Sequence, residues 1–283
     1  MNDTLATRGL VTAITTPFDA SNNVDTGALE SHVQCLWDNG CKHLLVSGTT
    51  GEFFSLTSVE KRKMLEVIRR SFHGTIMFHA GADCLADTVT LALAAQDAGA
   101  DSIATLPPWY LTGIEEEGLI AWLEQVAEAV SLPFLIYNFP KHTRCDLSAD
   151  LLRRVPHWGV KDSSANLQWI SHTPRYFVGS DKLMLKSHRA GGIGFISARS
   201  NCEPSLYARI DDAILLGNES LADQLHLEIL HVATALGGVN QISLIKRGVA
   251  AMLPGYPTAV RLPLLHAEET THIDEKIHRS NHD

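Results

Sequence analysis

Short apolar runs alternate with longer amphipathic segments along most of this 283-residue chain. This alternation is typical of repeated strand–helix units around a parallel sheet, whose strands are buried on both faces and are therefore apolar throughout. Eight strands are predicted, at residues 10–15, 43–47, 75–79, 102–106, 134–138, 159–162, 176–179 and 193–197.

Amphipathic helices are predicted between and after these strands. Asp25 and Thr57 are typical N-cap residues, and Gly40 and Gly99 are typical of positions just past a helix end. The predicted helices cover residues 26–38, 58–71, 85–98, 115–130, 149–154, 166–172, 182–190 and 204–216, and two more cover 219–236 and 241–253.

Eight strand–helix units predict an α/β protein folded as a (β/α)8 TIM barrel with additional C-terminal helices. Residues 1–216 are assigned to the barrel, and residues 217–268 to a C-terminal helical extension packed on it. Residues 269–283 are polar and rich in histidine, so we expect a flexible tail there.

The net charge and the hydropathy of the chain limit the kinds of partner that we expect. The formal net charge of −9 offers no broad cationic surface, so we expect no binding to nucleic acid or to membranes. The first nine residues lack the apolar run of a signal peptide, and no segment is apolar for about 18 residues, so we expect a cytoplasmic protein. The five cysteines lack paired spacing, which predicts free thiols.

In such barrels the reactive groups lie at the C-terminal ends of the strands and on the loops that follow. Lys161 lies inside a predicted strand, Gly159-Val160-Lys161-Asp162, where a charged ammonium is costly to bury. It either forms an ion pair, with Asp162 or another carboxylate, or acts as a neutral nucleophile that condenses with a ketone. Because adjacent strand residues point to opposite faces, pairing with Asp162 is disfavoured.

Tyr137 ends the preceding predicted strand, so its phenol is expected near Lys161. A tyrosine at this place often serves only in packing. Imine chemistry, however, needs a weak acid that moves protons onto and off the reacting groups. We therefore predict that Tyr137 is the proton shuttle.

Two loops carry further candidates. Gly48-Thr49-Thr50-Gly51-Glu52 combines flexible glycines with two hydroxyls and suits a carboxylate, although the same residues also form ordinary turns. Pro107-Pro108-Trp109-Tyr110 is a rigid aromatic turn after the fourth strand. Its rings are expected either to pack on the surface, to line the active site or to contact a second subunit.

Taken together, the loop 48–52, the run Tyr137-Asn138-Phe139-Pro140 and the strand 159–162 resemble the dihydrodipicolinate synthase and N-acetylneuraminate lyase family of class I pyruvate-dependent aldolases. The likeness runs from residue 9 to about residue 264. It includes Thr16-Pro17-Phe18 after the first strand and the late Arg261-Leu262-Pro263.

The resemblance implies a Schiff base between Lys161 and pyruvate, with Tyr137 as general acid and base and Thr49 as proton relay. It implies that Tyr110 completes the relay from a neighbouring subunit of a homotetramer built as a dimer of dimers. No metal or organic cofactor is implied.

Substrate-binding residues also follow from the resemblance. Thr50, with the backbone amides of Gly48 and Gly51, is expected to hold the keto-acid carboxylate. The remaining substrate-binding candidates lie after the fifth strand and at the ends of the seventh and eighth, and are His142, Gly179, Asp181, Ile196 and Ser197.

One departure from the family pattern bears on the second substrate. His142 occupies the position where the synthases carry an arginine that binds the carboxylate of aspartate semialdehyde. An imidazole lacks the bidentate guanidinium fork, although Lys141 or Arg144 could act from another angle. The Thr49-Thr50 pair resembles both the synthases and the 2-keto-3-deoxy sugar acid aldolases.

We therefore expect a Schiff-base lyase or aldolase that joins or separates pyruvate and an aldehyde, with a 2-keto-3-deoxy sugar acid or similar 2-keto acid as substrate. The first alternative is 4-hydroxy-tetrahydrodipicolinate synthase, which condenses pyruvate with aspartate semialdehyde. A second alternative is a non-catalytic protein that binds a keto acid. A metal enzyme is suggested only by the fourteen histidines and by His226-x-Glu228, and these two residues face different directions on a helix.

Overall fold

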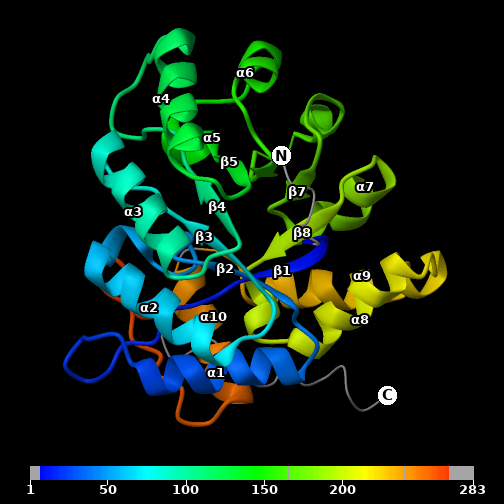
Figure 1. The fold of residues 1–283 in the computed structure, drawn as a ribbon. Helices are drawn as coiled ribbons and strands as arrows, with labels where there is room; N and C mark the ends of the chain where they lie inside the picture. The colour runs from blue at the N-terminus through cyan, green and yellow to red at the C-terminus, as the bar shows by residue number, and fades with distance from the viewer. Residues whose placement is uncertain (1–6, 165, 239, 268–283) are drawn as a thin grey trace. The chain divides into compact units, whose positions relative to one another are not determined.

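The computed structural model describes residues 7–267 except residues 165 and 239. Its eight strands form a closed barrel in chain order (Figure 1), as the sequence predicts. Predicted and observed strand ends differ by two residues at most. The strands are β1 (Gly9–Ala13), β2 (His43–Val46), β3 (Thr75–His79), β4 (Ser102–Thr105), β5 (Phe134–Asn138), β6 (Gly159–Asp162), β7 (Tyr176–Val178) and β8 (Gly194–Ser197).

Most of the predicted helices are confirmed to within one residue. They are α1 (Thr26–Asp38), α2 (Ser58–Ser71), α3 (Leu85–Asp97), α4 (Glu116–Ala129), α6 (Ala149–Arg154), α8 (Pro204–Leu215), α9 (Glu219–Ala235) and α10 (Gln241–Met252). The side chain of Asp25 caps α1, and Thr57 forms a capping box with Glu60 at the start of α2. Gly40 and Gly99 both have φ +89°, the left-handed conformation that ends a helix.

Three segments differ from the predicted helices. Residues 166–172 form the 3-10 helix Leu167–His172, because the Asn166 side chain accepts a hydrogen bond from the Gln168 amide and favours a tighter turn. Residues 182–190 divide into the 3-10 helix Asp181–Leu183 and α7 (Met184–Arg189). The short helix α5 (Pro140–Thr143) is not predicted; its proline at the first position has a φ suited to helix initiation.

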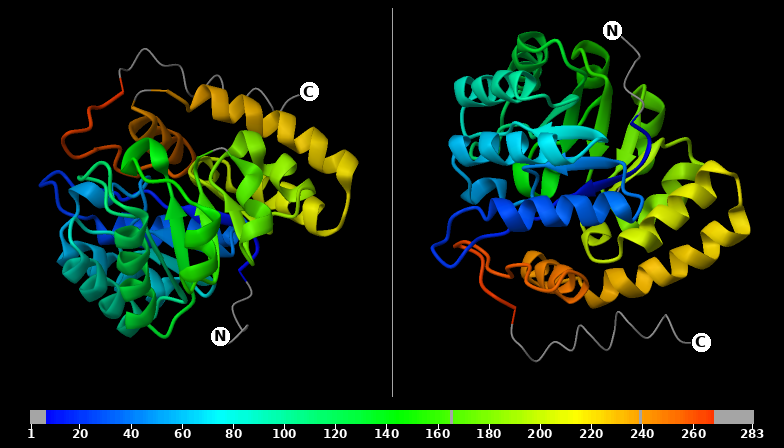
Figure 2. Two further views of the ribbon diagram at one scale, coloured as in Figure 1. Left: turned by 90° about the horizontal axis from the view of Figure 1, so that it is seen from above. Right: turned by 60° about the horizontal axis from the view of Figure 1, so that its bottom comes forward.

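The described residues divide into two compact units. The first holds residues 7–9 and 75–196, in which α3, α4, α6 and α7 lie beside the strands that they connect (Figure 1). The second holds residues 10–74 and 197–267, in which α9 runs alongside α8 and α1 packs on α2 (Figure 2). The predicted boundary between barrel and C-terminal extension at residue 216 stays a prediction, and the expected tail at 269–283 lies outside the described residues.

Two expectations from composition can be compared with the structure. All five cysteines are free thiols, as their spacing predicts. Within residues 7–267, apart from the two gaps, no helix is both long enough and apolar enough to cross a bilayer.

Gly194, the first residue of β8, is required by a close backbone approach. An added Cβ would lie 2.5 Å from the Gly9 carbonyl oxygen and 2.8 Å from two atoms of the Phe177 ring. We therefore expect Gly194→Ala to lower the free energy of unfolding, measured by urea denaturation, by about 1–3 kcal/mol through overpacking.

The matched control is Gly118→Ala on α4, where an added Cβ would meet nothing closer than the Ile114 Cγ2 atom at 3.8 Å. This change should leave stability unchanged or raise it by about 0.5–1 kcal/mol, because glycine weakens a helix. Equal unfolding free energies for the two variants would contradict the close approach at Gly194.

Candidate active site

Lys161 and Tyr137 share one face of the sheet. Strands β5 and β6 pair Tyr137 with Lys161 and Asn138 with Asp162, and paired residues on neighbouring parallel strands point the same way. Both side chains are buried, and the Lys161 Nζ atom lies 3.5 Å from the centroid of the Tyr137 ring. The predicted neighbourhood of amine and phenol is therefore present.

Asp162 faces the opposite side and has its own partners. Its Oδ1 accepts hydrogen bonds from Asn138 Nδ2 at 2.9 Å and from the Ser164 amide at 2.8 Å, and its Oδ2 accepts one from the Tyr176 hydroxyl at 2.6 Å. Burial, reinforced by this last bond, raises the pKa of Tyr176. The interpretation of Lys161 as an ion pair with Asp162 is therefore wrong.

Within the described part of the chain, no carboxylate lies within ion-pair distance of Lys161. The Lys161 amine contacts the Tyr137 ring. A lysine amine that lies beside a phenol, without a carboxylate partner, is placed to act as a nucleophile toward a ketone.

A row of rings leads outward from Tyr137. The rings of Tyr137 and Phe139 stack with centroids 6.0 Å apart, and the rings of Phe139 and His142 meet edge to face at 4.2 Å. Partial burial lowers the pKa of His142, and the charge of Lys141 adds to this effect. The His142 imidazole is therefore neutral near pH 7 and supplies no permanent positive charge.

The remaining candidates of the first unit differ in exposure. Tyr110 is 89% exposed, whereas Asp181 and Ile196 are buried. Gly179 follows β7, and a Cβ there would collide with the Ser163 hydroxyl, so the glycine permits a close approach of two strand ends. Their roles in substrate binding stay predictions.

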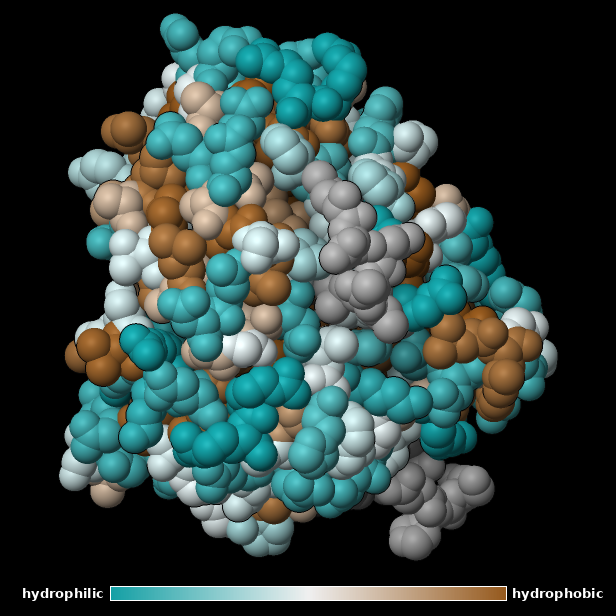
Figure 3. Space-filling view, in the orientation of Figure 1, coloured by the Kyte–Doolittle hydropathy of each residue, from teal (hydrophilic) through white to brown (hydrophobic). Residues whose placement is uncertain are grey.

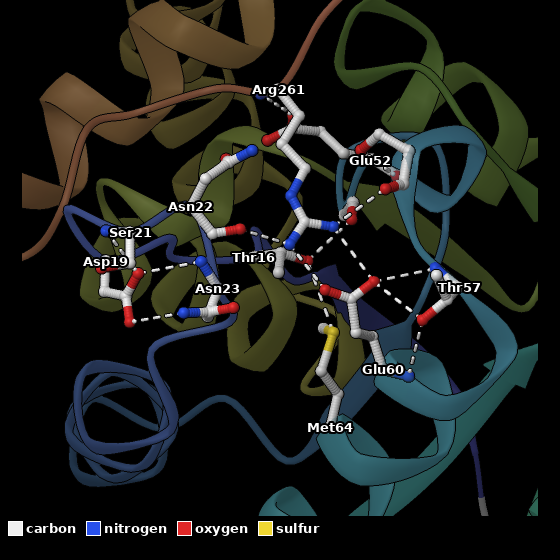
Figure 4. A network of polar contacts seen from close by, with 12 residues as sticks. Thr16, Asp19, Ser21, Asn22, Asn23, Glu52, Thr57, Glu60, Met64 and Arg261 are labelled. Atoms are coloured by element: carbon white, nitrogen blue, oxygen red, sulfur yellow. Dashed lines mark hydrogen bonds and ion pairs between the residues drawn. The ribbon is translucent and has the colours of Figure 1, made fainter.

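In the second unit, the loop that carries Thr49 and Thr50 is a tight turn held by hydrogen bonds. The Glu52 amide donates to the Thr49 carbonyl at 3.1 Å, and the Thr16 hydroxyl donates to the Gly51 carbonyl at 2.7 Å (Figure 4). Both threonines are half-buried. Also in this unit, the Ser197 hydroxyl accepts from the amides after β8, so it is engaged in a local turn.

Glu52, at the end of that loop, is the anchor. It adopts a left-handed conformation with φ +57°, and its carboxylate is completely buried. Its Oε1 lies 2.5 Å from Lys246 Nζ and its Oε2 accepts from the Arg261 amide at 2.9 Å. Lys246 also donates to the Ala259 carbonyl at 2.6 Å; burial lowers the pKa of Lys246, and Glu52 acts in the opposite direction.

Arg261 extends the network from Glu52 to Glu60 and Asn22 (Figure 4). Its guanidinium donates to Glu60 Oε1 at 2.6 Å and to the carbonyl of Asn22 at 2.5 Å, and hydrogen bonds from Arg261 lower the pKa of Glu60 to about 2. The Lys246 Nζ atom and the Arg261 Cζ atom each lie 4.3 Å from the centroid of the Phe18 ring. The network ties α10 and the segment after it to the threonine loop.

Lys246 and His79 are among the buried polar residues that the sequence reasoning did not single out. Lys246 is a fully buried lysine in α10. A charged residue on the apolar face of the predicted helix is the sequence feature that could have identified it. His79 is a fully buried histidine at the end of β3, and its signal would have been its strand-end position. Among the described residues no cluster of three or more His, Cys, Asp or Glu side chains could hold a metal ion.

A closed parallel barrel with an amine that faces a phenol on one side of the sheet defines the class of protein. It is a carbon–carbon lyase of the class I aldolase type, which uses a lysine Schiff base. The chain belongs to the dihydrodipicolinate synthetase family, whose model matches residues 6–279.

Individual relatives agree with this family. The 4-hydroxy-tetrahydrodipicolinate synthase of Methanopyrus kandleri is 32% identical over 279 residues, which cover 93% of this chain and 92% of the relative. A dihydrodipicolinate synthase crystal structure superposes with a TM-score of 0.88 at 27% identity, over 96% of this chain and 98% of that one. The pyruvate complex of YagE from E. coli gives a TM-score of 0.89 at 24% identity, over 96% and 97%.

The Lys246–Glu52 pair provides a stability prediction. Lys246→Met leaves the Glu52 carboxylate buried without its cation, so the free energy of unfolding should fall by about 3–5 kcal/mol. Urea denaturation measures this fall, and the double variant Glu52→Gln/Lys246→Met should recover part of it. Removal of the exposed Arg62–Glu66 pair by Arg62→Ala is the control, with an expected change below about 1 kcal/mol. A Lys246→Met variant as stable as this control would show that the buried pair is not an anchor.

Proposed function

We propose that Lys161 forms a Schiff base with pyruvate and that the protein makes or breaks a carbon–carbon bond between pyruvate and an aldehyde. The observation that carries this proposal is the buried Lys161 amine, 3.5 Å from the Tyr137 ring centroid, with Asp162 engaged elsewhere. Pyruvate is the ligand named for the YagE complex, and its C2 ketone is a carbonyl group of the kind with which a lysine amine condenses.

The reaction follows from the chemistry of an imine. The neutral Lys161 amine attacks the C2 carbonyl carbon of pyruvate, and the resulting carbinolamine loses water to form an iminium. Loss of a C3 proton gives an enamine, which adds to the aldehyde carbon; hydrolysis of the new iminium then releases the product and the free amine. Cleavage is the same sequence in reverse.

The proton transfers are assigned to Tyr137, with Thr49 as relay and Tyr110 completing the relay from a second subunit. The keto-acid carboxylate is assigned to Thr50 and to the amides of Gly48 and Gly51. The anchored turn supports this assignment, because donors that are fixed before binding lose little entropy when the substrate arrives.

For the second substrate we propose an uncharged aldehyde, such as the one released from a 2-keto-3-deoxy sugar acid. The neutral imidazole of His142 supports this choice, because it supplies no guanidinium fork for a carboxylate. Gly179, Asp181, Ile196 and Ser197 are assigned to the walls of the substrate site. Aspartate semialdehyde is the alternative, supported by the name of the Methanopyrus relative.

We further propose a homo-oligomer, a tetramer by the family resemblance. Tyr110 and Leu111 are 89% and 63% exposed on one loop of the first unit. Leu215 and Leu216 are exposed at the end of α8 in the second unit, where Figure 3 shows a hydrophobic patch. Exposed apolar groups of this kind are typical of subunit contacts. The cytoplasmic location and the absence of a cofactor stay predictions.

The Schiff base can be tested directly. After incubation with pyruvate and reduction with borohydride, mass spectrometry of peptides should find the adduct on Lys161. Lys161→Met should abolish the adduct and lower kcat by at least about 10³-fold, since the covalent route is lost. The exposed Lys186 on α7 provides the matched control, Lys186→Met, which should retain both. An adduct on another lysine, or none, would refute the proposal; an adduct without turnover of any aldehyde would indicate a keto-acid-binding protein.

The choice of aldehyde is a separate prediction. The kcat/KM for 2-keto-3-deoxygluconate cleavage should exceed that for condensation of pyruvate with aspartate semialdehyde. His142→Arg should raise the kcat/KM for the semialdehyde about tenfold or more, because a charge-assisted hydrogen bond contributes about 1.5–3 kcal/mol. His188→Arg, at an exposed histidine on α7, is the control without gain. Efficient use of the semialdehyde by the unaltered protein would identify it as a synthase.

A further inference from the structure

His79 is a fully buried polar residue that the proposed reaction does not yet use. It is the last residue of β3, where it pairs with Ala104 of β4. Ala104 in turn pairs with Leu135 of β5, two residues before Tyr137. Because paired residues share a face and the direction repeats every two residues, the side chains of His79, Tyr137 and Lys161 point to the same side of the barrel sheet.

The imidazole of His79 contacts the phenol of Tyr137. The two ring centroids are 5.7 Å apart and the ring planes meet at 80°, an edge-to-face arrangement. Aromatic pairs prefer this geometry because the edge of one ring meets the electron-rich face of the other. The Tyr137 ring thus contacts the Lys161 amine and the Phe139 ring as well as the His79 imidazole.

The loop after β3 holds the imidazole in place. A Cβ added to Gly81 would lie 2.6 Å from both the Cε1 and the Nε2 atom of His79. The backbone of Gly81 therefore runs directly against the ring, and the absence of a side chain there makes room for a histidine. This backbone limits the space for the imidazole on the side of the loop, and the Tyr137 ring is in contact with it.

We propose that His79 is a positioning residue for the proposed proton shuttle. It holds the Tyr137 ring in the orientation that presents its face to the Lys161 amine, and it thereby fixes the direction of the phenol hydroxyl during proton transfer. A misplacement of about 1 Å in a reacting group can cost about 10²-fold in rate, so a contact of modest energy has a large kinetic effect. The proposal rests on the role of Tyr137 in the proposed function.

The test needs no knowledge of the aldehyde. Exchange of the pyruvate methyl protons with D₂O, followed by NMR, reports enamine formation and therefore proton transfer. The yield of borohydride-trapped adduct at saturating pyruvate reports Schiff-base occupancy. His79→Leu, which removes the ring but keeps an apolar side chain, should slow exchange by about 10-fold to 100-fold while the trapped yield and the KM for pyruvate stay within about twofold of the unaltered protein.

His79→Phe, which keeps a ring at this position, should restore exchange to within about threefold of the unaltered rate. The exposed His188 on α7 supplies the control variant His188→Leu, which should exchange at the unaltered rate. Should His79→Leu fail to fold, as judged by circular dichroism, the smaller polar variant His79→Asn takes its place with the same expected loss.

A double-variant cycle distinguishes an effect of His79 through Tyr137 from an effect that is independent of Tyr137. Tyr137→Phe alone should slow exchange, and addition of His79→Leu to it should cause little further loss, because both changes disable one group. Multiplicative losses, or an unaltered exchange rate in His79→Leu, would overturn the role of His79. An unaltered exchange rate in Tyr137→Phe would instead overturn the proposed role of Tyr137, and loss of trapped adduct in the unaltered protein would overturn the Schiff base itself.

Discussion

The register between β5 and β6 is the constraint on which the candidate site depends. Parallel pairing opposes Tyr137 to Lys161 and Asn138 to Asp162, and the pleat sends these two pairs to opposite faces. One face thereby receives an amine and a phenol, while the other receives a carboxylate and its donors. A slip of one residue in either strand would exchange the two sets and remove the site.

The opposite face of that pairing explains why Lys161 remains unpaired with its sequence neighbour. Asp162 is fully buried, so its negative charge requires donors, and Asn138, Ser164 and Tyr176 supply them. Because these three donors hold the Asp162 carboxylate, the Lys161 amine is not its partner. Side chains alternate between the two faces of a strand. The hydrogen bonds of Asp162 on one face and the Lys161–Tyr137 pair on the other both follow from this alternation.

The second unit shows a different way of holding a loop. The turn after β2 ends at Glu52, which is buried in a left-handed conformation between Lys246 Nζ and the Arg261 amide. A left-handed non-glycine residue and a buried ion pair are each costly alone. In this loop the left-handed conformation of Glu52 occurs together with the contact between its carboxylate and the Lys246 amine. A short loop thus becomes rigid enough to preorganise its hydroxyls and amides.

Several features were predictable from the sequence because they depend on local chemistry. The eight apolar strands, the capped starts of α1 and α2 and the left-handed ends at Gly40 and Gly99 follow from periodicity and from the preferences of single residues. The nearness of Lys161 and Tyr137 was also predictable, because consecutive strands of such a barrel are neighbours and their lengths are short. The short helix α5 and the 3-10 turns were missed, since a few residues carry too weak a periodic signal.

What the tertiary structure alone decided lies in contacts between distant segments. The hydrogen bonds from Asn138 and Tyr176 to Asp162, the burial of Lys246 beside Glu52 and the contact of His79 with Tyr137 each join residues that are 14 to 194 positions apart. No local pattern encodes such pairs, because register and packing between elements determine them. The sequence by itself thus determined the barrel, the strand lysine Lys161 and the neighbouring phenol of Tyr137. Only the folded chain decided which charges are compensated, which ring contacts the phenol and which histidines have a lowered pKa, because burial and partners set those properties.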